Sequence, residues 1–119
     1  LPLQALAGEP GVTSCRRIEI PLDRGRLDLP VLMSSLAEAG CGEVLLEAGP
    51  RVAASFLSAG LIDELMLFVA PKIMGAEAKP LFDLRIDTME ESIQYEWLGV
   101  ESVGDDLLLV AAPKRKADK

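Results

Sequence analysis

The stretch Glu43–Gly75, EVLLEAGPRVAASFLSAGLIDELMLFVAPKIMG, decides the fold because its pattern predicts a strand, a tight turn, a helix and a second strand in succession. The apolar run near its start is typical of a strand buried on both faces, so we expect a strand over Val44–Glu47. Glu47 then stands where this strand leaves the sheet. Gly49 permits a sharp turn, and Pro50 suits the first position of a helix because no N–H is needed there.

The helix predicted over Arg51–Ala59 ends at Gly60, a residue type that commonly terminates helices. One side of this helix carries small side chains, so a backbone or a flat ligand could approach it closely. In open α/β sheets ligands bind beyond the carboxyl ends of the strands, and a helix N-terminus offers free N–H groups to phosphate. The turn after Glu47 is therefore a candidate anion site beside a carboxylate.

Two structural explanations compete with this site. A strand, turn and helix with Gly and Pro in the turn are ordinary in α/β proteins, and most such turns bind nothing. Glutamate is seldom placed directly after an apolar strand run unless it is paired or functional. A buried structural salt bridge is accordingly the alternative role for Glu47.

Three linked motifs occur along this part of the chain: LEAGP at Leu46–Pro50, AGLIDEL at Ala59–Leu65 and APKIMG at Ala70–Gly75. Together they closely resemble the reductase half of the bifunctional riboflavin-biosynthesis deaminase/reductase, and a looser resemblance extends from Val12 to Pro113. The resemblance implies a dihydrofolate-reductase-like fold. It also implies that NADPH is used to reduce the ribose of a phosphoribosylamino-pyrimidine to a ribityl chain.

By this resemblance, Glu47 matches the family glutamate that contacts the substrate, and a carboxylate suits ribose hydroxyls because its hydrogen bonds are charge-assisted. The turn and helix start match the family's cofactor-binding loop, whose backbone N–H groups would hold the NADPH pyrophosphate. The matching residues are Gly49, Pro50, Arg51, Val52, Ala53, Ala54 and Ser55. No proton donor is identified, and Lys72 is interpreted as a solvent-exposed strand-end lysine, with phosphate binding as the alternative.

The pattern of the whole chain predicts the order β-α-β-α-β-β-β, which is an α/β mixed sheet flanked by helices. The elements expected outside the opening stretch are a lead-in loop over Leu1–Gly11, a strand over Val12–Ile20, a turn over Pro21–Arg26, a helix from an Asp28 cap to near Gly40, a loop with one helical turn over Gly75–Glu91, and a hairpin turning at Gly104 into Leu107–Ala112. Ile93, Tyr95 and Trp97 alternate with polar residues. We interpret this aromatic stripe as a core face rather than as a stacking platform.

Residues 1–113 are expected to be the C-terminal portion of a reductase domain, and residues 114–119 a basic, disordered tail. The chain begins with Leu1 and has no signal-peptide pattern, and the family's upstream substrate-phosphate strands cannot fit into Leu1–Gly11. We therefore expect a longer parent that supplies the N-terminal remainder of the domain and a deaminase domain, and we expect the isolated chain to be inactive. The alternative is a non-catalytic nucleotide-binding or dimerisation module.

The composition limits the partners further. A net charge of −7 argues against nucleic acid, and no apolar run approaches the roughly 20 residues that span a bilayer. A hydrophobic share of 50% in 119 residues leaves apolar surface that favours a homo-oligomer.

Histidine is absent, which excludes a Ser-His-Asp triad and an imidazole base, and no metal site is expected. Cys15 and Cys41 match no metal or redox spacing and are expected as buried thiols in a reducing cytoplasm.

Overall fold

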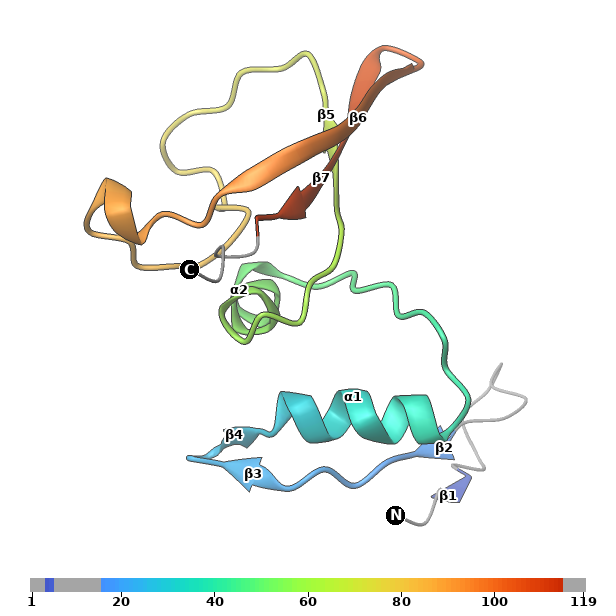
Figure 1. The fold of residues 1–119 in the computed structure, drawn as a ribbon. Helices are drawn as coiled ribbons and strands as arrows, with labels where there is room; N and C mark the ends of the chain where they lie inside the picture. The colour runs from blue at the N-terminus through green and yellow to red at the C-terminus, as the bar shows by residue number, and fades with distance from the viewer. Residues whose placement is uncertain (1–3, 6–15, 115–119) are drawn as a thin grey trace. The chain divides into compact units, whose positions relative to one another are not determined.

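The computed structural model describes residues 4–5 and 16–114, and the chain divides into two compact units, Leu1–Leu45 and Leu46–Lys119 (Figure 1). In the first unit the elements are β1 (Gln4–Ala5), β2 (Arg16–Arg17), β3 (Leu22–Asp23), β4 (Arg26–Leu27) and α1 (Leu29–Glu38). In the second they are α2 (Pro50–Ser58), β5 (Leu65–Val69), the 3-10 helix η1 (Met89–Glu91), β6 (Tyr95–Val103) and β7 (Asp106–Pro113).

The strands of the first unit form two short antiparallel pairs, β1 with β2 and β3 with β4. The turn between β3 and β4 has positive φ at both central residues, Arg24 and Gly25, as the tightest hairpin turns require. The turn predicted over Pro21–Arg26 is thus a two-stranded hairpin. Most of the expected lead-in loop and the first part of the strand expected over Val12–Ile20 lie outside the described residues.

Helix α1 begins and ends as its sequence predicts. The Asp28 carboxylate accepts a hydrogen bond of 3.0 Å from the Val31 N–H, which satisfies one of the free donors of the first turn. Gly40 follows the helix with a φ of 92°, a conformation that glycine adopts without steric cost. Cys41 is exposed, so the expectation of a buried thiol is wrong there, while Cys15 lies outside the described residues.

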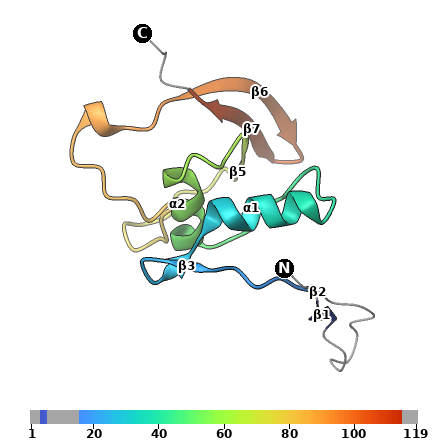
Figure 2. The same ribbon diagram turned by 60° about the horizontal axis from the view of Figure 1, so that its bottom comes forward.

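The second unit is built around an antiparallel three-stranded sheet in the order β5-β7-β6 (Figure 2). The hairpin between β6 and β7 turns at Gly104, where φ is 61°, and confirms the predicted position. The predicted helical turn in the acidic loop is also confirmed. It is η1, which begins with a capping box between Thr88 and Glu91.

The strand predicted over Val44–Glu47 is wrong: this segment has no regular secondary structure, and Leu45 is 77% exposed. A strand is stabilised by hydrogen bonds to neighbouring strands, and none of the segments in the described part of the chain pairs with this one. All strand pairs among the described residues are antiparallel, so the parallel element of the expected mixed sheet is not formed here.

The buried core of the second unit is small, and its members lie on α2 and on the central strand β7. Its buried apolar side chains are Ala54, Phe56, Leu57, Leu108 and Ala111. The aromatic stripe predicted as a core face is only partly buried: Tyr95 is half-buried, whereas Ile93 and Trp97 are 38% and 63% exposed. Trp97 lies opposite Ala111 in the register of β6, an edge strand that is paired on one side only among the described residues. No helix in the described residues combines the length and the apolar character that a bilayer span requires.

Candidate functional site

The candidate site lies at the start of helix α2. Gly49 is the N-cap residue, with φ −67° and ψ 172°, and it provides no side-chain hydrogen bond to the helix. This extended backbone is open to any residue type, so the turn does not require glycine as the sequence suggested. The Ala53 N–H bonds to the Gly49 carbonyl at 3.0 Å. Among the described residues, the N–H groups of Arg51 and Val52 in the first turn have no capping partner.

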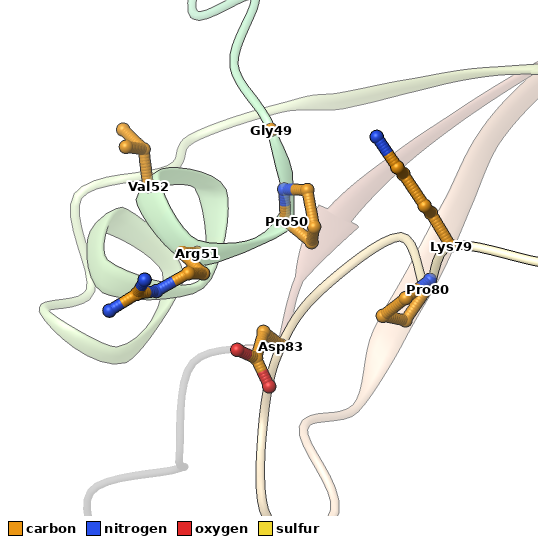
Figure 3. A pocket seen from close by; sticks show the side chains of 7 residues that line it. All are labelled: Gly49, Pro50, Arg51, Val52, Lys79, Pro80 and Asp83. Carbon is orange, nitrogen blue, oxygen red and sulfur yellow. The ribbon is translucent and has the colours of Figure 1, made fainter.

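A hollow of about 530 Å³, wide open to solvent, lies against this helix start (Figure 3). We call it the α2 hollow, and it is lined by Gly49, Pro50, Arg51, Val52, Lys79, Pro80 and Asp83. One wall is the first turn of α2, and the other is the loop that follows β5. Its volume lies within the range of about 300–1,000 Å³ that small-molecule sites occupy.

A backbone hydrogen bond holds the two walls together. The Asp83 N–H donates to the Pro50 carbonyl oxygen at 3.0 Å. Both walls also contain a proline, Pro50 in one and Pro80 in the other, and each fixes its own φ near −65°. The backbone on both sides of the hollow is therefore restrained before any ligand binds.

The side chains around the hollow give it a mixed but mainly cationic charge. Arg51 and Lys79 are positive and Asp83 is negative, and all three side chains are exposed. Among the described residues, neither cation forms an ion pair. Figure 3 shows the Arg51 and Lys79 side chains pointing in different directions from the two walls. The arrangement can bind an anion, because free N–H groups and unpaired cations border the same space.

The sequence-predicted site residues fall into two groups. Gly49, Pro50, Arg51 and Val52 line the hollow. Farther along α2, Ala53 and Ser55 are half-buried and Ala54 is buried, and the Ser55 hydroxyl donates to the Arg51 carbonyl at 3.0 Å. Glu47 is exposed in the irregular segment before the helix and is not among the residues that line the hollow.

Sequence reasoning missed the second wall of the hollow. Lys79, Pro80 and Asp83 lie beyond β5, and a lysine and a proline in an acidic loop carry no recognisable motif. Lys72, the lysine that the sequence did single out, is exposed and does not line the hollow. No group of three or more metal-ligating His, Cys, Asp or Glu side chains occurs in the described part of the chain.

Two solved structures share the fold of this chain. Forms 2 and 1 of Acinetobacter baumannii RibD match it with a TM-score of 0.71 at 28% and 27% sequence identity, covering 79% and 80% of this chain and 30% of each RibD chain. The chain is thus an α/β fragment of a reductase domain with the dihydrofolate-reductase-like fold. The family model described as "RibD C-terminal domain" matches residues 5–109, and the chain belongs to this family.

Two relatives agree with this assignment. The riboflavin biosynthesis protein RibD of Escherichia coli K12 is 37% identical over 95 residues, which are 79% of this chain and 26% of that protein. The 5-amino-6-(5-phosphoribosylamino)uracil reductase of Buchnera aphidicola (subsp. Acyrthosiphon pisum) is 32% identical over 91 residues, or 76% of this chain and 44% of that enzyme. The chain therefore spans less than half of each relative.

Proposed function

We propose that this chain is part of an NADPH-dependent 5-amino-6-(5-phosphoribosylamino)uracil reductase of riboflavin biosynthesis. The observation that carries the proposal is that the family-like motif at Leu46–Pro50 leads directly into the α2 hollow, which is bordered by free N–H groups of the helix start and by the cations Arg51 and Lys79. The Buchnera relative is named as a 5-amino-6-(5-phosphoribosylamino)uracil reductase, which supports this substrate. The residues present fit a phosphate-bearing cofactor because the hollow offers donors and positive charge at one place.

When bound, NADPH would provide the hydride-donor chemistry that reduction of the substrate's ribose requires. The N–H groups of Arg51 and Val52, which have no capping partner among the described residues, would hold the pyrophosphate of the cofactor. Ala53, Ala54 and Ser55 continue the helix behind these donors. Glu47 accepts hydrogen bonds from the ribose hydroxyls and so orients the substrate.

The proposal includes the rest of the domain. The chain spans 26% of the E. coli relative and 44% of the Buchnera relative, so the N-terminal remainder of the reductase domain and a deaminase domain are proposed partners in a longer, cytoplasmic protein. We propose that the 119-residue chain alone is inactive. The exposed apolar side chains of the sheet favour a second role as a dimerisation module.

Two measurements test the proposal. Saturation-transfer NMR with NADPH on the 119-residue chain asks whether the cofactor is bound, and we expect contacts to both ends of the dinucleotide. Measuring NADPH consumption by the longer protein, with and without the pyrimidine substrate, tests whether NADPH is used as the reductant. If the longer protein binds NADPH without turnover, its role is nucleotide binding alone. If it shows no binding and no turnover, the dimerisation role is the one that remains.

A further inference from the structure

We draw no further inference here: the strongest candidate, the exposed apolar face that Trp97, Val100 and Leu107 share on the β5-β7-β6 sheet, carries nothing because nothing in the described part of the chain shows what covers it.

Discussion

The backbone N–H of Asp83 donates a 3.0 Å hydrogen bond to the carbonyl oxygen of Pro50, and this one bond joins the two walls of the α2 hollow. Pro50 is the first residue of α2, whereas Asp83 belongs to the loop after β5. The free N–H groups of the helix start and the Lys79 side chain are brought to the same space by this contact. The shape of the candidate site therefore depends on a backbone contact that no side-chain motif encodes.

The first prediction concerns this hydrogen bond. Asp83→Pro removes the N–H donor, and we expect a loss of about 1 kcal/mol in the free energy of unfolding, the typical net contribution of one hydrogen bond. Asp83→Asn keeps the donor and serves as the control, with no such loss. Native-state hydrogen exchange gives a check without a mutation, because the Asp83 amide should exchange more slowly than the exposed amides around it. Equal exchange rates would contradict the presence of the bond in solution.

The second prediction concerns Glu47 in the longer enzyme. Glu47→Ala should lower kcat/KM for the pyrimidine substrate roughly ten- to a hundredfold, because a charged hydrogen-bond partner of the ribose hydroxyls is lost. The KM for NADPH should change little, since Glu47 does not line the α2 hollow. Glu43→Ala is the matched control, because Glu43 is also exposed in the segment before α2. An unchanged kcat/KM would show that Glu47 does not bind the substrate.

The third prediction uses the open space at Gly49. A Cβ atom built at this position meets no other atom within 4 Å, and the φ of −67° suits any residue. Gly49→Val should therefore leave the Tm nearly unchanged, whereas its side chain occupies the space in which a pyrophosphate would approach the helix start. We expect calorimetric titration to show weaker NADPH binding for Gly49→Val and an intermediate effect for Gly49→Ala. Equal affinity in all three proteins would mean that the turn is structural only.

Local signals in the sequence predicted the elements that depend on local interactions. The Asp28 cap and Gly40 mark the two ends of α1, and Pro50 and Gly60 mark those of α2. Helix caps and helix-ending residues act within a few residues, so the local sequence is enough to predict them. The hairpin at Gly104 was predicted for the same reason. The prediction of a strand over Val44–Glu47 was wrong because a buried strand needs partner strands on both sides, and the described residues supply none.

Only one wall of the α2 hollow, the start of α2, could be predicted from the sequence. The helix start was visible in the sequence because Gly and Pro mark it, but Lys79 and Asp83 reach the hollow through a tertiary contact that has no sequence signature. Burial was misjudged for a related reason. An alternating strand predicts which residues share a face, whereas the exposure of Trp97 depends on what covers that face.

The fourth prediction concerns Tyr95, whose hydroxyl group is shielded from solvent and has no hydrogen-bond partner within the described part of the chain. Desolvation by burial raises the pKa of this phenol above its ordinary value of 10.0, because the folded protein favours the neutral form. The contribution of Tyr95 to stability is therefore complete below pH 10 and is lost as the pH rises through the raised pKa. Tyr95→Phe should abolish this alkaline loss and leave the Tm at neutral pH equal or higher, because an unpaired polar group is removed. Thermal melts of both proteins at neutral and strongly alkaline pH test this, and a lower Tm for Tyr95→Phe at neutral pH would indicate that the hydroxyl has a partner.

The last prediction concerns the sheet β5-β7-β6 of the isolated chain. Within the described residues β5 and β6 each pair on one side, and the large apolar side chains of Phe68 and Trp97 are 64% and 63% exposed. Unpaired strand edges with apolar side chains associate readily, and full burial of one such side chain contributes about 1.5–3 kcal/mol. Sedimentation at micromolar concentration should show a dimer or a larger species, and NADPH oxidation with the pyrimidine substrate should remain at background.

A pair of substitutions on β6 separates apolar contact from charge in this association. Trp97→Lys removes apolar area and adds a positive charge at the strand edge, so we expect it to shift the chain toward monomer. Glu101→Lys changes the charge of the same strand at an exposed position but keeps every apolar side chain, and it should associate as the wild type does. If Glu101→Lys also yields monomer, electrostatic repulsion rather than apolar burial governs the contact. If the wild-type chain is monodisperse, monomeric and active, the prediction is wrong and the sheet needs no partner. Exposure of the Trp97 side chain to solvent would then impair neither folding nor catalysis.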